Sequence, residues 1–237
     1  RASLLVRKLA PATVNRRIAA LRSLVKLAKT IGMVAWSLDV ESVKAERYRD
    51  TKGPGRGGVR SMLDALTSKV GPKGTRDRAI VRCLFDLGLR RGEVCSLDVE
   101  HFDAKAGTLA ILGKGRAQRE TLTLAPTTKA ALVAWPSPRG ATPGAPFWAL
   151  ARSSKGHRLT GTAVYKIVRA LGVEVGLKVR PHGLRHTAIT MALDATNGDV
   201  RRAAKFSRHR DLRTLSVYDD ARTDMAGEVA ALVAAAV

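Results

Sequence analysis

A chain of 237 residues with 45% hydrophobic content is long enough to form one large domain or two, with a real hydrophobic core. Its 42 Lys and Arg residues against 20 Asp and Glu residues leave a net charge of +22, which favours a polyanionic partner. Because aromatic residues make up only 4% of the chain, few side chains can stack on unpaired bases, and duplex phosphate is a better match than a single strand.

Cysteine usage and hydropathy indicate a protein of a reducing compartment. Cys83 and Cys95 stand twelve positions apart with no CxxC motif, which predicts neither a disulfide framework nor a zinc knuckle. The longest apolar run, Ala230–Val237, is too short to span a bilayer, and no signal peptide opens the chain. We therefore expect a soluble cytoplasmic protein with no membrane partner, nucleoid-associated when bound to DNA. Because the chain opens at Arg1 without Met, in sequence that already looks structured, we expect further residues upstream.

The first predicted element is an amphipathic helix over Thr13–Lys29. Its apolar residues recur at helical spacing, and its basic residues lie off that face. The apolar set is Val14, Ile18, Leu21, Val25 and Ala28, and the basic set is Arg16, Arg22, Lys26 and Lys29. A solvated charged surface is the alternative, but the charge of the whole chain favours a helix that faces DNA. A second short helix is expected over Val40–Arg49.

A Gly- and Pro-rich stretch over Asp50–Arg60 is expected to form a linker without helix or strand. It reads DTKGPGRGGVR, and its cations Arg56 and Arg60 favour a path along a DNA backbone. This linker divides a small N-terminal domain, residues 1–49, from a larger domain, residues 61–237.

Two helices are expected after the linker. Ser61–Asp64 resembles a capping box, and Thr75 is expected to cap a second helix that ends at Gly88. The buried stripe of this second helix is expected to contain Ile80, Cys83, Leu84 and Leu87. Next, Arg90, Arg91 and Glu93 stand on a sharp turn into a short helix, where a surface ion pair is the alternative to a functional role.

A β-hairpin is predicted from two alternating runs, Thr108–Leu112 and Glu120–Leu124. The turn signal between them places Lys114 at or near the hairpin tip. A mobile ammonium there can reach into a groove and protonate a leaving oxygen, although a solvated turn lysine is the common alternative. A helix capped by Thr160 is expected further on, and Tyr165 on it is expected to pack or to contact backbone.

The segment Pro181–Tyr218 carries the chemistry. His182 and Arg185 lie on consecutive turns of one predicted helix, His209 follows, and Tyr218 comes nine positions later. Cationic and proton-carrying groups can converge on one phosphate, while a phenol attacks the phosphorus. His182 and His186 have a spacing that suits zinc, but no Glu follows His182 and no third ligand is present. With Arg185 between them a phosphate is the better ligand, so neither metal nor cofactor is expected.

Four stretches in order, GLRRGEVCSL, LGKGRAQRETLTL, PHGLRHT and SRHRDLRTLSVY, resemble the active-site boxes of the tyrosine recombinases, the phage-integrase and Xer-like enzymes. The resemblance covers residues 60–237, and more loosely 13–49, which is similar to the end of the family's helical core-binding domain. It implies a mainly α fold with a small antiparallel β-sheet or hairpin, in which a partial core-binding domain precedes the catalytic domain.

The resemblance also assigns roles to single residues. It implies that the catalytic residues are Arg90, Lys114, His182, Arg185, His209 and Tyr218, and that Glu93 supports Arg90. It implies that Tyr218 attacks DNA to give a 3′-phosphotyrosyl bond and a free 5′-hydroxyl. Religation then needs no ATP, because the covalent link keeps the bond energy, and no metal is required, because the arginines do the electrostatic work.

Two departures from the family's pattern stand out. Arg208 occupies a position where the family usually has Gly, and it is expected to add a phosphate contact. The N-terminal domain is also short, with only about two of the family's four or five helices.

The apolar C-terminal segment, about residues 224–237, resembles the family's exchange helix, which inserts into a neighbouring protomer; folding back onto its own domain is the alternative. This implies a homotetramer on two DNA duplexes, and a monomer or weak oligomer without DNA.

The resulting interpretation is a site-specific recombinase or integrase acting on double-stranded DNA. Two alternatives stay open: a type IB topoisomerase-like enzyme that nicks and reseals a strand, and a non-catalytic DNA-binding module. Exchange of strands at a synapse separates the first from recombination, and an effect of Tyr218→Phe separates the second.

Overall fold

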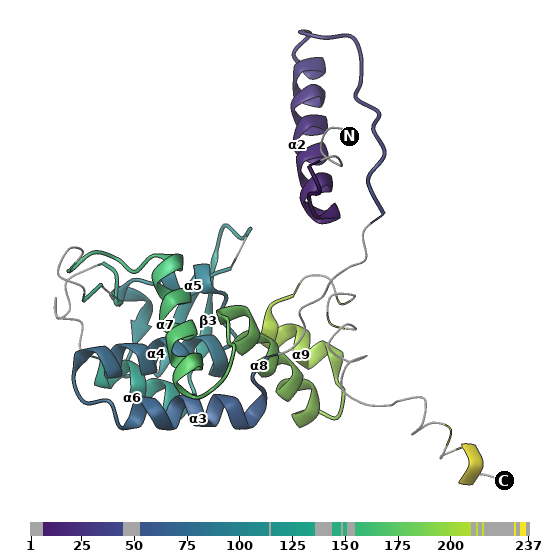
Figure 1. The fold of residues 1–237 in the computed structure, drawn as a ribbon. Helices are drawn as coiled ribbons and strands as arrows, with labels where there is room; N and C mark the ends of the chain where they lie inside the picture. Colours follow the sequence, from purple (N-terminus) through teal and green to yellow (C-terminus); the bar gives the residue numbers. More distant parts are fainter. Residues whose placement is uncertain are drawn as a thin grey trace. The chain divides into compact units, whose positions relative to one another are not determined.

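The computed structural model describes residues 7–44, 53–113, 115–135, 144–147, 149–150, 155–209 and six isolated or short positions beyond, 212, 215, 230 and 233–235. The chain divides into two compact units, Arg1–Asp50 and Thr51–Val237. The expected mainly α fold with a small antiparallel sheet is confirmed (Figure 1).

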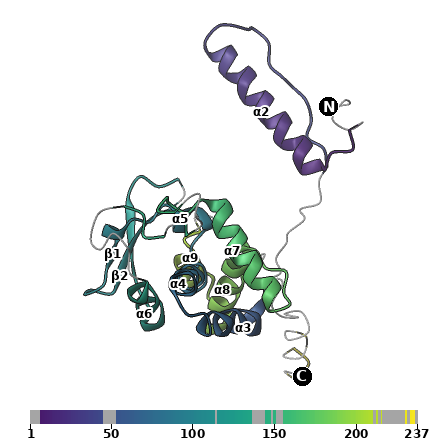
Figure 2. The ribbon, with the colours of Figure 1, turned by 60° about the vertical axis from the view of Figure 1, so that its left-hand side comes forward.

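The first unit contains helix α2, Pro11–Thr30, and an extended segment that runs back along it (Figures 1 and 2). Pro11 begins the helix because its ring fixes a helical φ and its missing N–H is not needed there. The Asn15 side chain accepts from the Val43 backbone N–H (2.7 Å) and donates to the Val43 carbonyl (2.8 Å). Residues 40–44 form no helix, so our expectation that a helix begins at Val40 is wrong; residues 45–49, the rest of the expected helix, lie outside the described part.

The second unit begins with helices α3, Gly55–Thr67, and α4, Pro72–Asp86. Our expectation of a linker without helix up to Arg60 is wrong, since α3 starts within it. Four of its residues, Val59, Met62, Leu63 and Leu66, are buried along one face. Their burial outweighs the helix-breaking tendency of the three glycines in the first turn.

The predicted caps of these helices are also wrong. Ser61 lies inside α3, where its hydroxyl donates to the Gly57 carbonyl (3.2 Å), and Thr75 lies inside α4, whose first residue is Pro72. The stripe of α4 is confirmed: Ile80, Cys83, Leu84 and Leu87 are buried. Burial raises the pKa of the Cys83 thiol to about 12, so it behaves as a small hydrophobic side chain.

The sheet has three antiparallel strands in the order β1–β2–β3. They are β1, Phe102–Asp103, which follows a short 3₁₀ helix η1 (Val99–His101), β2, Thr108–Leu112, and β3, Arg119–Thr123. The hairpin is confirmed, with Ala110 opposite Thr121, and β3 begins one residue before the expected position. Two residues are too few to show an alternating pattern, so β1 was not foreseen.

Among the described residues, five further α-helices up to residue 207 belong to this unit. They are α5, Arg91–Cys95; α6, Pro126–Ala134; α7, Gly161–Glu174; α8, Pro181–Ala195; and α9, Val200–Ser207. Helix α7 is capped as expected, because the Thr160 hydroxyl accepts from the Ala163 N–H (3.2 Å).

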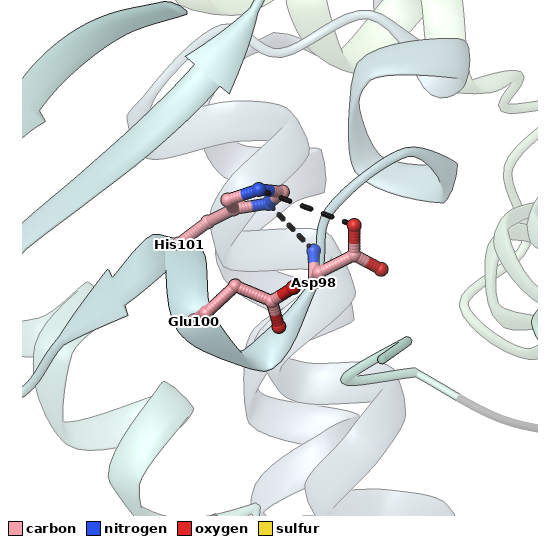
Figure 3. A group of neighbouring side chains, drawn as sticks. All are labelled: Asp98, Glu100 and His101. Atoms are coloured by element: carbon pink, nitrogen blue, oxygen red, sulfur yellow. Dashed lines mark hydrogen bonds and ion pairs between the residues drawn. The ribbon is translucent and has the colours of Figure 1, made fainter. Parts of the chain in front are cut away.

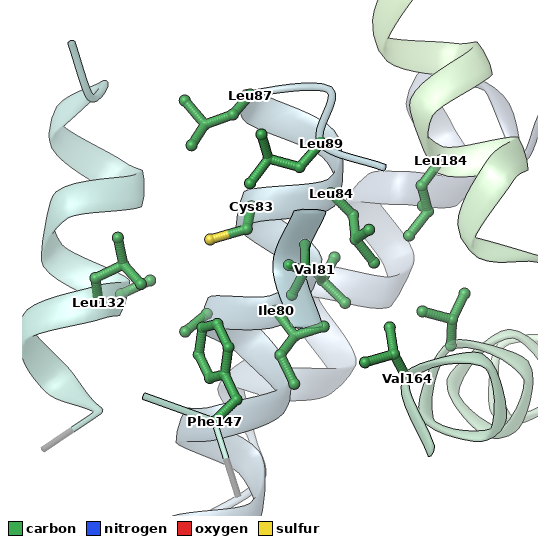
Figure 4. Close-up of a cluster of buried hydrophobic side chains, with 14 of the residues drawn as sticks. Ile80, Val81, Cys83, Leu84, Leu87, Leu89, Leu132, Phe147, Val164 and Leu184 are labelled. Atoms are coloured by element: carbon green, nitrogen blue, oxygen red, sulfur yellow. The ribbon is translucent and has the colours of Figure 1, made fainter. Parts of the chain in front are cut away.

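Two hydrophobic clusters hold these helices. The larger one surrounds α4 and collects side chains from α6, α7, α8 and the segment at Phe147 (Figure 4). A smaller cluster joins α8, α9 and Leu215, so the helices that carry the second half of the predicted site pack partly on their own core. Among the described residues, no helix combines the length and apolarity that crossing a membrane requires.

Candidate active site

Arg90 and Glu93 are joined at the start of α5. Arg90 is the N-cap of this helix, and the Glu93 carboxylate accepts from its backbone N–H (2.8 Å) and from its Nη1 (2.8 Å). Burial alone would raise the pKa of Glu93, but the two hydrogen bonds from Arg90 and the charges of Arg208 and Arg90 lower it below its ordinary value. Glu93 is therefore ionised, and it fixes the position of the Arg90 guanidinium.

Arg185 lies on α8 and is 2% exposed. Its guanidinium donates to the Gly88 carbonyl, just past the end of α4, and to the Ser207 carbonyl, at the end of α9. The last carbonyls of a helix carry partial negative charge, so these two helix ends stabilise the buried cation. Gly88 has φ +54°, which favours glycine, and a Cβ there would lie 3.2 Å from the Phe206 ring.

His209 follows α9 and contacts Arg185. Its Nε2 lies 3.3 Å from Arg185 Nη2, and its Nδ1 lies 2.9 Å from Ser207 Oγ. Because a guanidinium can only donate, Nε2 must accept, and the neutral ring carries its proton on Nδ1, which donates to Ser207. Burial, and then the charges of Arg185, Arg90 and Arg208, lower the pKa of His209 to about 4. At neutral pH the ring is therefore uncharged.

These residues meet in one pocket of about 520 Å³. It is lined by Leu89, Arg90, Arg91, Gly92, Tyr165, Arg180, Pro181, His182, Arg185 and His209. His182 is exposed and stands edge-on to His186, with 5.0 Å between the ring centroids. The first turn of α8 also lines the pocket. Four arginines and a helix N-terminus make this pocket a site for an anion such as phosphate.

The structure thus brings together four of the six predicted catalytic residues: Arg90, His182, Arg185 and His209. Lys114, in the connection between β2 and β3, and Tyr218 lie outside the described residues. The prediction missed that Arg180 and Tyr165 line the pocket; Arg180 immediately precedes the PHGLRHT stretch, which was the only available signal.

The predicted DNA-binding residues lie in three kinds of environment. Arg16, Lys26, Arg56 and Arg60 are exposed, the last two on α3 rather than on a linker. Arg22 and Lys29 contact the returning segment of the first unit, at the Val40 carbonyl and at Ser37 Oγ (2.9 Å). The expected phosphate contact at Arg208 is not what the structure shows, because this residue is 6% exposed and its guanidinium points into the protein.

A second group of polar side chains is Asp98, Glu100 and His101, whose ligand atoms lie within 4.8 Å of one another (Figure 3). Each has a protein partner. His101 Nδ1 accepts from the Asp98 backbone N–H (2.7 Å), Asp98 pairs with Arg158, and Glu100 accepts from the Gly144 N–H (3.2 Å). This group joins three segments of the fold and shows no feature of a metal centre beyond its composition.

Comparison with known proteins identifies the family of this chain. Residues 58–225 match the model of the phage integrase family. A tyrosine recombinase of Synechocystis sp. is 42% identical over 239 residues, which covers 99% of this chain and 76% of that protein. One of Synechococcus elongatus is 42% identical over 234 residues, covering 96% and 73%.

Solved structures share the fold. A XerH site-specific recombinase bound to its difH substrate has a TM-score of 0.74 at 19% identity, covering 96% of this chain and 69% of that one. A transposon integrase in complex with transposon end DNA has a TM-score of 0.71 at 12% identity, covering 100% and 83%. The family match and the relatives together show that this chain belongs to the phage integrase family and is a tyrosine-type site-specific recombinase.

Proposed function

We propose that the recombinase cleaves and rejoins duplex DNA at a phosphate held in the pocket described above, with Tyr218 as the nucleophile. The observation that carries this proposal is the convergence of Arg90, His182, Arg185 and His209, which come from three separate elements, on one cationic pocket. Packing alone gives no reason for several cations to line the same pocket, whereas a bound phosphate does.

The two fixed guanidiniums supply the electrostatic part of catalysis. Arg90 is held by Glu93 and Arg185 by two helix ends, so neither has to reorganise when charge develops on the phosphate oxygens. Attack by the Tyr218 oxygen forms the 3′-phosphotyrosyl bond and breaks the bond to the 5′ oxygen. Lys114 is proposed to give that oxygen its proton, and the reverse reaction rejoins a strand.

The histidines are proposed to orient the phosphate and to handle the phenol proton. His209 is neutral at pH 7, and its Nε2 accepts from Arg185. A bound phosphate offsets the arginine charges that lower the pKa of His209, so the ring becomes a better proton acceptor once DNA is bound. His182, exposed on the first turn of α8, is the second candidate for proton transfer.

Double-stranded DNA is the proposed partner of both units. The net charge of +22 supports it, as do the DNA complexes of the two recombinases of similar fold. We assign the first unit as part of a core-binding domain and the second, beginning at α3, as the catalytic domain. The exposed side chains proposed to contact the DNA backbone are Arg16, Lys26, Arg56 and Arg60.

We further propose that the active assembly is a homotetramer on two duplexes, with residues 224–237 as the exchange helix. Without DNA the protein is proposed to be a monomer or a weak oligomer. Sedimentation of the protein alone and with duplex DNA of its site measures both states.

The test of the reaction is covalent trapping. The protein is incubated without metal with nicked suicide duplexes of varied sequence and then denatured, and adducts are counted for the wild type, Tyr218→Phe and Tyr165→Phe. Tyr165 is the matched control because it also lines the pocket. We expect an adduct in the wild type and in Tyr165→Phe and none in Tyr218→Phe. An adduct that persists in Tyr218→Phe contradicts the assignment of the nucleophile.

A further inference from the structure

Arg208 has an unusual backbone conformation for a residue with a long side chain. It ends α9 in the left-handed region, at φ +57° and ψ +33°, where helices commonly place glycine. The chain thus accepts a disfavoured conformation at the position directly before His209. This conformation directs the guanidinium of Arg208 into the protein rather than toward solvent.

The buried guanidinium joins three segments. Its Nη1 donates to the carbonyls of Leu87 (3.0 Å) and Phe206 (3.0 Å), and its Nη2 donates to the Gly88 carbonyl (3.1 Å) and lies 3.4 Å from Glu93 Oε2. Only an arginine has enough donors, in a rigid planar arrangement, for four such acceptors.

Two of these acceptors are shared with the phosphate-binding arginines. The Gly88 carbonyl accepts from Arg185 as well as from Arg208, and Glu93 Oε2 accepts from the Arg90 backbone as well as from Arg208. A continuous series of contacts therefore runs from Arg90 through Glu93, Arg208 and Gly88 to Arg185. No direct contact between Arg90 and Arg185 is needed to fix their separation.

The charges around Arg208 agree with this arrangement. Burial lowers the pKa of the Arg208 guanidinium below its ordinary value, and the negative charges of Glu93 and of Glu120 on β3 oppose this shift. Glu93 is thus flanked by two cations, one that lines the pocket and one behind it. Removing Arg208 leaves Glu93 to Arg90 alone and removes one of the two donors that hold the Gly88 carbonyl.

We propose that Arg208 is a positioning residue that holds Arg90 and Arg185 at the separation at which both bind the same phosphate. This inference rests on the proposed function, since it concerns the phosphate at which the strand is cut. It replaces the expected role of Arg208 as a direct DNA contact. The two roles predict opposite effects on binding and on cleavage.

The experiment compares Arg208→Met, Arg208→Lys and Arg208→Gly with the wild type, below the unfolding temperature of each. Single-turnover cleavage of a suicide duplex is measured at saturating DNA, and the DNA Kd is measured over a range of salt. Met keeps the length of the side chain and the backbone strain but has no charge. Gly relieves the strain and also lacks the guanidinium, so it separates the two effects.

We expect Arg208→Met and Arg208→Gly to lower the saturated cleavage rate at least tenfold, with Kd within twofold and an unchanged salt slope. Arg208→Lys should recover part of the rate, because an ammonium can reach some of the same acceptors. With a neutral methylphosphonate at the cleavage position, the variants should lose less of the wild-type cleavage rate than with a phosphate, because the placement of two cations matters less for an uncharged group.

Two results overturn the inference. A weaker Kd with a salt slope reduced by about one, at an unchanged saturated rate, shows a direct phosphate contact. A lower melting temperature with unchanged cleavage and binding shows a purely structural role.

If the wild type forms no adduct, it is the proposed function that fails. The position of the arginines is then measured by NMR relaxation of the Arg90 and Arg185 Nε–H signals in the wild type and in Arg208→Met. Equal order in the two proteins refutes the positioning role, and increased mobility in the variant supports it.

Discussion

The protonation of His209 gives the sharpest quantitative prediction. Its pKa of about 4, against an ordinary value of 6.5, means that the folded protein resists protonation of this ring while the unfolded chain does not. Between pH 6.5 and 4 the unfolded state therefore binds more protons, so the stability that His209 contributes is present above pH 6.5 and is lost as the pH falls to about 4. Below pH 4 both states are protonated at this site and the loss stops.

The magnitude follows from the size of the shift. A depression of about 2.5 pKa units at about 1.4 kcal/mol each gives a ceiling of about 3 kcal/mol. The His209 ring is only partly buried, so screening by water reduces this to about 1–2 kcal/mol. His209→Gln removes the titrating group and keeps a polar side chain of similar reach.

The assay is urea unfolding of the wild type and His209→Gln at pH values from 4 to 7.5. The wild type should lose about 1–2 kcal/mol more than the variant over this range. NMR titration of the five histidine side chains gives the pKa of His209 directly, and inorganic phosphate or duplex DNA should raise it. A His209 pKa near 6.5 in the free protein, or equal pH dependence of the two proteins, would refute the reasoning.

Two further predictions concern the support of the site, and a third concerns the DNA contacts. Glu93→Gln removes the carboxylate that pairs with the buried guanidinium of Arg208, and it should lower the free energy of unfolding by about 3 kcal/mol. Urea unfolding measures this change, and a loss below about 0.5 kcal/mol would contradict the ion pair. Gly88→Ala should lower the free energy of unfolding by about 1–2 kcal/mol, because φ is +54° and the new Cβ contacts the Phe206 ring. It should also slow cleavage, because it shifts the carbonyl to which Arg185 donates; unchanged stability and cleavage would refute this. Arg56→Ala should reduce the slope of log K against log salt by about one, whereas Lys69→Ala, whose cation is paired with Glu174, should not; equal slopes would remove Arg56 from the DNA contacts.

Local pattern was enough to predict several elements and much of the site. The stripe of α4, the hairpin and the cap of α7 depend on neighbours within a few residues, and each was found at or near its predicted position. The boxes GLRRGEVCSL and PHGLRHT, which contain Arg90 and Arg185, each include the start of a helix, and both helix starts line one pocket.

What the pattern could not give depends on distant parts of the chain. Helix α3 begins among glycines, whose helix propensity is poor, because burial of Val59 and Met62 in the core compensates for it. The acceptors of Arg208 at Leu87, Gly88 and Glu93 lie 121, 120 and 115 positions away. The residues near Arg208 in sequence therefore do not distinguish a buried arginine from one that contacts DNA at the surface. Tyr165 similarly reaches the pocket only through the docking of α7.

The start of the second unit packs closely against the helix that carries Arg185. Gly53, the first described residue of this unit, packs so closely on α8 that a Cβ would collide with the Gly183 carbonyl and the Thr187 hydroxyl, and the Gly55 N–H donates to that hydroxyl (3.2 Å). Gly183 and Thr187 flank Arg185 along α8. Any side chain larger than that of glycine at position 53 therefore has to displace α8 within one turn of Arg185. The position of Arg185 thus depends on a glycine that does not itself line the pocket.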